Sequence, residues 1–421
     1  MQETVKLVLG IDLCDDITQV TVMRPHAAEP AAVCFDVRTR NEFLPTRLRL
    51  GQNGEWEIGE TPQSGSKTLP PFFHAAAVGT EVKDGDTVYS GRELLECYVS
   101  LLIEKIRERF CEQEIGFVAV TCEEANTKET VRHMLYEIFG EKEGFSERCL
   151  VLSHLEAFLH FAIRQEEGLW KNGSAAFEYT TEGLLFYSME CRSTGGRRLL
   201  LADYKDYSEI ISAGFATEGE TGQRTLAFER LAETALQQKA VSLFVTGRGF
   251  EGDWAADVLR FLSGGRRVFH GQNLYTQGAC YAGTEEFGQE RNVDFSLLMP
   301  EQITADIYLI AENTAQEDGI LMAKTGEEYR KVRAEAEVLL DATDKLTFRI
   351  VPAGVAVPVV IRVTQKNPEL RGDRTSRYRI RLFFAERNLM VIQLKETGFG
   401  EFYPPSDRIY EELVDLSQLE L

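Results

Sequence analysis

The sequence predicts an α/β domain followed by an all-β domain. Up to about residue 290, β-rich runs alternate with helical patterns, an order typical of layered α/β folds. From about residue 294, short β-rich runs follow one another with turn residues between them, as in an antiparallel sandwich. The 421 residues suffice for two or three domains of about 150 residues each. We therefore predict two domains, residues 1–290 and 291–421.

The N-terminal part begins with two predicted hairpins and a long helix. The apolar run Val5–Ile11 and the β-rich run Ile17–Val22 flank a polar break, which is typical of a hairpin. A second hairpin is expected over residues 46–59, because Gly51-Gln52-Asn53-Gly54 is a turn sequence. Residues 91–112 predict an amphipathic helix with an apolar residue at every fourth position. Four further elements follow: strands at 116–121 and 149–152, and helices at 126–140 and 154–165.

The second half of the α/β part shows the same alternation of predicted strands and helices. Residues 175–189 predict a strand, a turn around Thr180–Gly183 and a second strand. An apolar strand at 241–246 leads into Gly247-Arg248-Gly249, with helices expected at 223–239, 253–263 and 273–282. In the C-terminal part the β-rich runs lie at 307–312, 320–324, 335–340, 346–351, 357–364, 378–385 and 389–395, and Asp407–Leu413 carries a helical signal.

Charge and composition restrict the class of partner. The chain has 46 Lys and Arg against 67 Asp and Glu, a net charge of −21. Nucleic acids and anionic membranes both bind positive surfaces, so we expect neither as a partner. No run approaches the ~18 apolar residues of a membrane span, and the N-terminus lacks the pattern of a signal peptide. We therefore expect a cytoplasmic protein.

The cysteines and histidines show no close spacing. None of the eight cysteines lies two or three residues from another, and the six histidines form no HxxxH or HExxH pattern. Structural zinc sites and redox motifs both depend on such spacing, so neither is supported. We interpret the cysteines as mostly buried, reduced thiols, with one reactive thiol as the alternative.

Six short patterns occur in a fixed order between about residues 5 and 285. They are VLGIDL at 8–13, Leu44-Pro45-Thr46 with Ile58-Gly59, Ala119-Val120-Thr121 followed by Leu150–Phe158 with Glu156-Ala157, Phe177–Gly183, Val245–Gly249 and Asn273–Cys280. In this order they resemble the nucleotide-binding domains of actin-like ATPases and heat-shock chaperones, which have a two-lobed, ribonuclease-H-like α/β fold. The whole chain, with Gly398-Phe399-Gly400-Glu401 near its end, is also similar to a bacterial domain-of-unknown-function family built on this fold.

The resemblance implies two phosphate-binding hairpins whose carboxylates hold Mg²⁺ through water. Asp12 matches the first carboxylate, with an ordinary polar turn residue as the alternative. Cys14, Asp15 and Asp16 stand where the family has glycine and hydroxyl residues. Two extra carboxylates would repel a triphosphate at short range. The first hairpin therefore departs from the pattern that ATP binding requires.

The second hairpin departs as well. Glu178 matches a catalytic or metal-facing position, and Thr180 and Thr181 are the candidates to donate to phosphate, but Glu182 and the lack of glycines leave less room. Glu156 matches the carboxylate that orients the attacking water, although Ala157-Phe158 replaces Pro-Thr. The alternatives are an ordinary strand residue for Glu178 and an ordinary helix residue for Glu156.

The glycines of the last two patterns are better kept. Gly247 and Gly249 match the pair that faces adenosine, since a strand ending in G-x-G lets a ligand approach the backbone. Gly278 belongs to the closing helix, where the family pattern implies close packing more than ligand contact. Outside this part, Arg377, Arg379 and Arg381 share one face of a predicted strand, either docking onto an acidic surface or simply solvated.

Two functions follow from the resemblance. In the first, which we favour, the fold persists as an interaction scaffold that binds nucleotide weakly or not at all and contacts protein partners through the C-terminal domain. In the second, the chain is an active ATPase that binds ATP with Mg²⁺ and couples lobe closure to the C-terminal domain. A small-molecule kinase and a chaperone-like role are further alternatives. Whether the chain is an enzyme stays open at this point.

Overall fold

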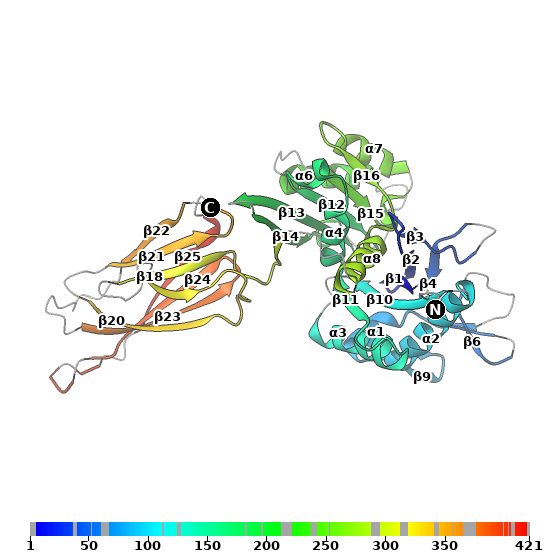
Figure 1. Cartoon of the computed structure of the whole chain (residues 1–421), viewed down its shortest axis with the longest axis horizontal. Helices are drawn as coiled ribbons and strands as arrows, with labels where there is room; N and C mark the ends of the chain where they lie inside the picture. The colour runs from blue at the N-terminus through cyan, green and yellow to red at the C-terminus, as the bar shows by residue number, and fades with distance from the viewer. Residues whose placement is uncertain are drawn as a thin grey trace. The chain divides into compact units, whose positions relative to one another are not determined.

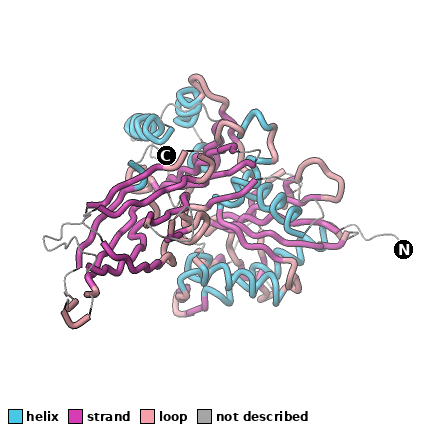
Figure 2. Tube along the Cα trace, turned by 60° about the vertical axis from the view of Figure 1, so that its left-hand side comes forward, coloured by secondary structure: helices cyan, strands magenta, loops and turns pink. Residues whose placement is uncertain are grey.

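The computed structural model describes residues 6–36, 40–51, 53–59, 67–111, 113–123, 128–181, 183–194, 197–211, 221–236, 242–251, 253–287, 295–311, 319–340, 345–355, 357–364, 376–398, 400–402, 404–405 and 409–418. Val5, Gln52, Glu182, Phe399 and Asp407, named above, lie outside these residues. The protein is a mixed α/β structure with several sheets (Figures 1 and 2). It divides into two compact units, Met1–Met189 with Tyr204–Val293, and Glu190–Asp203 with Asp294–Leu421.

The first sheet of the larger unit contains the predicted N-terminal hairpin. Its strands run in the order β11-β10-β1-β2-β3, and β4 also pairs with β2. β1 and β2 are antiparallel, whereas β1, β10 and β11 are parallel to one another. Parallel strands end at the same edge of a sheet, so the ends of these three lie together. The bounds are β1 Lys6–Leu13, β2 Ile17–Met23, β3 Ala31–Ala32, β4 Phe43–Pro45, β10 Glu114–Cys122 and β11 Cys149–Ser153.

Helices and two small sheets accompany this sheet. The predicted amphipathic helix is α2 (Gly91–Arg109), and its apolar positions Leu94, Tyr98 and Leu102 are buried in the core. α3 (Glu129–Tyr136) continues into a π-helix, Glu137–Lys142. None of the described helices is both long and apolar enough to span a membrane. The remaining elements are α1 Phe73–Val78 and strands β5 Arg49–Leu50, β6 Trp56–Glu57, β7 Lys67–Thr68, β8 Glu81–Asp84 and β9 Thr87–Ser90.

The second sheet repeats the arrangement of a hairpin beside parallel strands. Its order is β16-β15-β12-β13-β14-β17, with β12 and β13 antiparallel and β12, β15 and β16 parallel. β17 pairs with residues 198–201 of β14, which belong to the smaller unit. The bounds are β12 Ser174–Tyr179, β13 Leu184–Thr194, β14 Arg197–Asp206, β15 Ser242–Thr246, β16 Val268–His270 and β17 Phe295–Leu298, with helices α6 Thr221–Leu236 and α7 Asp253–Leu262.

Two glycines allow one helix of this unit to lie very close to a second helix and to strand β1. α4 (His154–Ile163) follows β11 directly, and α8 (Leu274–Phe287) lies against α4, β1 and β10 (Figure 1). A Cβ at Gly278 would lie 1.9 Å from the carbonyl oxygen of Ala157, and one at Gly10 would lie 2.0 Å from that of Thr276. Only glycine permits such an approach. The short helix α5 (Glu167–Trp170) follows α4.

The described residues of the smaller unit form two four-stranded sheets that contribute to one core. The sheet orders are β19-β18-β21-β22 and β20-β23-β24-β25, and the core includes Ile307, Phe348, Tyr378 and Ile392. The seven β-rich runs predicted here correspond to observed strands. The bounds are β18 Ala305–Ile310, β19 Ile320–Ala323, β20 Arg333–Leu340, β21 Lys345–Pro352, β22 Val359–Thr364, β23 Ser376–Glu386, β24 Leu389–Glu396 and β25 Ile409–Asp415.

One expectation for this unit needs correction, and a second gains detail. The helix predicted at Asp407–Leu413 is wrong, because Ile409–Asp415 is strand β25, antiparallel to β24, with Tyr410 and Val414 packed against the core at strand spacing. The predicted arginine face lies on β23, where its partly exposed side chains bond to groups of the same unit. Arg379 pairs with Glu337 at 3.1 Å and Arg381 with Glu335 at 2.7 Å, both on β20, and Arg377 Nε donates to the carbonyl of Gly398.

Candidate functional site

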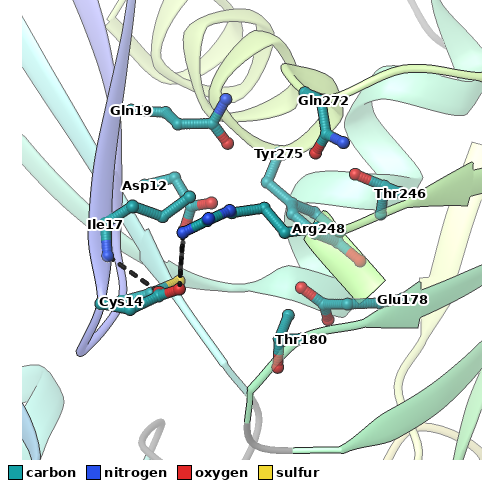
Figure 3. Close-up of a pocket in the computed structure, with 12 residues that line it drawn as sticks. Asp12, Cys14, Ile17, Gln19, Glu178, Thr180, Thr246, Arg248, Gln272 and Tyr275 are labelled. Atoms are coloured by element: carbon teal, nitrogen blue, oxygen red, sulfur yellow. Dashed lines mark hydrogen bonds and ion pairs between the residues drawn. The ribbon is translucent and has the colours of Figure 1, made fainter. Parts of the chain in front are cut away.

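The two hairpins each place one carboxylate near a strand end. Asp12 is the last residue but one of β1, and Glu178 is the last but one of β12. Both are almost fully buried, at 5% and 3% exposure. Figure 3 shows Asp12 and Cys14 coming from the first hairpin and Glu178 and Thr180 from the second, around one pocket. The sequence analysis singled out both carboxylates, and the structure brings them to the same place.

A fully buried histidine joins the two carboxylates. His154 is the first residue of α4, immediately after β11, and its Nε2 lies 2.8 Å from Asp12 Oδ1. Its Nδ1 lies 3.0 Å from Glu178 Oε1 and 3.1 Å from Oε2. The ring stacks on Tyr275 with 3.9 Å between ring centroids and 7° between planes. The Tyr187 hydroxyl also donates to Glu178 Oε2 at 2.8 Å.

The surroundings of His154 favour its charged form. Burial by itself lowers the pKa of His154, but the charges of Glu178 and Asp12 and the hydrogen bonds to both raise it well above its usual value. With a carboxylate at each ring nitrogen, both nitrogens donate and neither has a free lone pair. The site is therefore an imidazolium held between two carboxylates that come from different hairpins.

Glu156, the residue expected to orient a water molecule, has a different position. It is the third residue of α4 and forms a capping box, in which Ser153 N donates to Glu156 Oε2 at 2.6 Å and Glu156 N donates to Ser153 Oγ at 3.1 Å. Its carboxylate also pairs with Arg132 at 2.6 Å. Glu156 does not line the pocket. The strand-to-helix turn was identified correctly, but the residue that faces the hairpins is His154, two positions earlier.

The sequence analysis missed His154, although a signal for it exists. It follows the apolar run 149–152, and that strand is parallel to β10 and hence ends at the same edge as β1. A polar residue directly after such a strand is placed where ligands commonly meet open α/β sheets. The search for histidine pairs at metal-binding spacing could not find it, because its partners are 142 and 24 residues away in the sequence.

The pocket in front of the two carboxylates is small. The space in it that can hold water is about 30 Å³, enough for one or two water molecules. The Arg248 side chain reaches across it (Figure 3), and its guanidinium lies 3.8 Å from the Asp16 carboxylate. Burial raises the pKa of Asp16, although the backbone N–H of Ile17 and the charge of Arg248 oppose this shift. The pocket mouth thus carries an ion pair of the protein's own.

The glycine pair expected to face adenosine packs against Tyr179, and Gly247 also lines the pocket. Gly247 has φ +95°, and a Cβ there would lie 2.3 Å from the carbonyl oxygen of Tyr179. A Cβ at Gly249 would lie 2.2 Å from Cδ1 of the same tyrosine. The Tyr179 ring packs edge-on against Phe250 and Trp254, each with 5.8 Å between centroids. Gly247 is therefore required by the close approach of the Tyr179 backbone, and Gly249 by that of the Tyr179 ring.

The remaining predicted site residues make contacts within the protein, and Thr180 also lines the pocket. Thr180 N donates to Gly183 O at 3.0 Å, which closes the turn, and Thr180 Oγ1 donates to Glu123 Oε1 at 3.2 Å. Thr181 is exposed at the tip of the hairpin. Gly278 does not line the pocket, and its close contact with Ala157 is the helix packing that the family pattern implied.

Cys14 completes the group of reactive side chains. Its thiol donates to Asp12 Oδ1 with 3.6 Å between sulfur and oxygen. Burial and the nearby acids, Asp12 first among them, raise the pKa of Cys14 well above its usual value. Asp12, Cys14 and His154 each offer one ligand atom, and these atoms all lie within 4.8 Å of one another.

Comparison with known families covers both units of the chain. The model of the C-terminal part of a family of unknown function (DUF5716) matches residues 29–299, which is more than half of the chain. The model of a domain of unknown function (DUF8552) matches residues 302–416. None of the curated proteins matches the chain.

Proposed function

Because the chain belongs to the DUF5716 family of unknown function, we propose its function from the site itself: a non-hydrolysing relative of the actin-like ATPases that acts as an interaction scaffold. The observation that carries this proposal is the His154 imidazolium between Asp12 and Glu178. In the family that the sequence resembles, the corresponding carboxylates hold hydrated Mg²⁺. Here a side chain of the protein supplies the positive charge between them.

The residues present do not fit Mg²⁺ and a nucleoside triphosphate. Mg²⁺ requires oxygen ligands in octahedral geometry, but Asp12 and Glu178 already accept hydrogen bonds directly from His154. Small-molecule sites usually enclose about 300–1,000 Å³. The space for water in the pocket is about 30 Å³, and Tyr179 packs against the glycine pair expected to face adenosine.

The same side chains do not support hydrolysis. A general base must accept a proton from the attacking water, and the protonated His154 has no lone pair to do so. Of the two carboxylates expected to be catalytic, Glu178 accepts hydrogen bonds from His154 and Tyr187, and Glu156 accepts one from the start of its own helix and pairs with Arg132. We therefore expect no ATPase activity.

Internal contacts across the site favour an interaction scaffold over an ATPase whose lobes move with nucleotide. Besides the imidazolium bridge, Gln19 on β2 donates to Asn273 just before α8 at 2.9 Å, and Arg248 pairs with Asp16. These contacts tie the first hairpin to segments more than 200 residues later in the chain. We propose that the protein acts by presenting its surfaces to protein partners, including those of the C-terminal unit.

Isothermal titration calorimetry with ATP and ADP, each with and without Mg²⁺, tests this proposal. We expect no binding heat up to millimolar nucleotide. Micromolar, Mg²⁺-dependent binding that Asp12→Ala and Gly247→Val both abolish would overturn it and establish the active ATPase as the better description. Far-ultraviolet circular dichroism of each variant shows whether a loss of binding reflects a loss of fold.

A further inference from the structure

The carboxylate, thiol and imidazole of the site form a donor set that the proposed scaffold function does not use. Asp12 Oδ1 is the meeting point, with His154 Nε2 at 2.8 Å and Cys14 Sγ at 3.6 Å. The backbone fixes all three residues, because Asp12 lies on β1, Cys14 opens the turn after it, and His154 begins α4. We propose that Asp12, Cys14 and His154 bind one zinc-like transition-metal ion.

The chemistry of the donors indicates which ions would bind. A thiolate and an imidazole together favour borderline and soft cations such as Zn²⁺ or Co²⁺ over Mg²⁺, which prefers oxygen ligands. The close sequence spacing of ordinary zinc sites is absent because the ligands come from two segments 140 residues apart. This explains why the distribution of cysteines and histidines along the sequence did not predict the site.

The surroundings of His154 resemble those of metal-bound histidines. Such histidines usually donate their second ring N–H to a carboxylate, which orients the ring and increases its basicity as a ligand. Glu178 occupies this position at Nδ1, and the Tyr187 hydroxyl holds Glu178 in turn at 2.8 Å. Nε2 is then the nitrogen that faces Asp12 and Cys14. The orienting contacts needed for a metal ligand are therefore already in place.

The exchange of protons for metal conserves charge. Binding one divalent ion would release two protons, one from Cys14 Sγ and one from His154 Nε2. The two positive charges gained equal the two lost, so the net charge of this buried group is unchanged. Burying an uncompensated charge has a large free-energy cost, and this exchange creates no such charge. The small pocket beside Asp12 and Cys14 offers room for a water molecule as a fourth ligand.

This inference goes beyond the scaffold proposal and does not depend on it. Either cation, the imidazolium or the metal, would join the first hairpin to α4. A nucleotide titration says nothing about thiolate ligation, and a thiolate–metal band says nothing about nucleotide, so the two proposals fail separately.

Titration of the full-length, chelator-treated protein with Co²⁺ tests the proposal by absorption spectroscopy. We expect the visible bands of tetrahedral Co²⁺ and a thiolate-to-cobalt charge-transfer band, both displaced by Zn²⁺. Cys14→Ser should abolish the charge-transfer band, whereas Cys34→Ser, which alters a thiol outside the group, should leave it intact. Glu178→Gln should weaken binding by about 10- to 100-fold.

Alkylation gives a second measurement that needs no variant to fold. We expect Zn²⁺ to protect Cys14, but not the exposed Cys111, from modification, as measured by peptide mass spectrometry. The absence of a charge-transfer band at millimolar Co²⁺, a band that persists in Cys14→Ser, or equal alkylation of Cys14 with and without Zn²⁺ at a pH where the metal-free thiol reacts, would each overturn the proposal.

Discussion

His154 has no exposed surface and donates to a carboxylate at each ring nitrogen, so its ionisation is coupled to folding. In the unfolded chain a histidine loses its proton near pH 6.5. In the folded protein the pKa of His154 is well above its usual value, because Glu178 and Asp12 outweigh the effect of burial. The stabilisation from this shift is complete below about pH 6.5 and is lost as pH rises through the folded pKa.

We therefore expect the free energy of unfolding to fall as the pH rises from about 6.5 to about 8.5, below the range in which the Cys14 thiol ionises. The slope from this group should approach 1.4 kcal/mol per pH unit, roughly the cost of one proton. Urea denaturation in metal-free buffer measures it. ¹⁵N NMR of the histidine side chains, with His154→Gln to assign the signal, should show both His154 nitrogens protonated at pH 7.5. A neutral ring there would contradict the charge assigned to the site.

The residues of the site differ in how far the sequence could predict them. Asp12 and Glu178 were found because the two hairpins resemble the phosphate hairpins of the actin-like ATPases, and each is a carboxylate near the end of its strand. His154 was missed, because its place after the strand 149–152 suggests a site residue but does not show which residue of the strand-to-helix turn faces the other hairpin. Glu156 lies only two positions later, and which of the two residues faces the hairpins depends on where α4 begins in the folded structure.

At the scale of elements, α8 can lie against α4 only because residue 278 is a glycine and has no Cβ. A Cβ at Gly278 would lie 1.9 Å from the Ala157 carbonyl oxygen, and backbone cannot move aside cheaply. In an open helix, replacing glycine with alanine gains about 1 kcal/mol from helix propensity. For Gly278→Ala we expect a net loss of about 1–3 kcal/mol, because overpacking forces the helices apart.

Gly222→Ala is the matched control for this prediction. Gly222 also lies in a helix, α6, but a Cβ there meets nothing within 4 Å. We expect its stability to be unchanged or slightly increased in the same denaturation experiment. Equal stabilities for the two variants would mean that α8 can shift away from α4 without cost.

The elements themselves were largely predictable because apolar periodicity reports which face is buried. The predicted helix over residues 91–112 and the N-terminal hairpin are confirmed as α2 and as β1 with β2. Prediction failed where the apolar residues of a segment fit both a helical and a strand period, as in the acidic segment that forms β25. It also failed where partners are distant, since nothing near Arg379 and Arg381 in the sequence indicates the glutamates of β20.

At the scale of the whole chain, two compact units have separate cores, and the two family matches meet near residue 300. Nucleotide-driven coupling to a C-terminal domain would require the units to respond together, whereas a scaffold does not. The stabilities of the two units therefore bear on the choice between the two functions. Each unit offers a buried residue whose removal should affect its own core.

Differential scanning calorimetry of single variants makes this choice. His154→Ala leaves two buried carboxylates without their cation and should cost about 3–5 kcal/mol, which lowers one thermal transition. Tyr378→Ala removes a fully buried ring of the smaller unit and should lower the other by a similar amount. The control is His160→Ala, on the same helix but at a partly exposed pair with Glu285. It should lower the free energy of unfolding by no more than about 1 kcal/mol and leave both thermal transitions close to their original temperatures. If His154→Ala lowers both transitions together, the units are coupled, and a nucleotide-independent scaffold no longer explains why the two are joined.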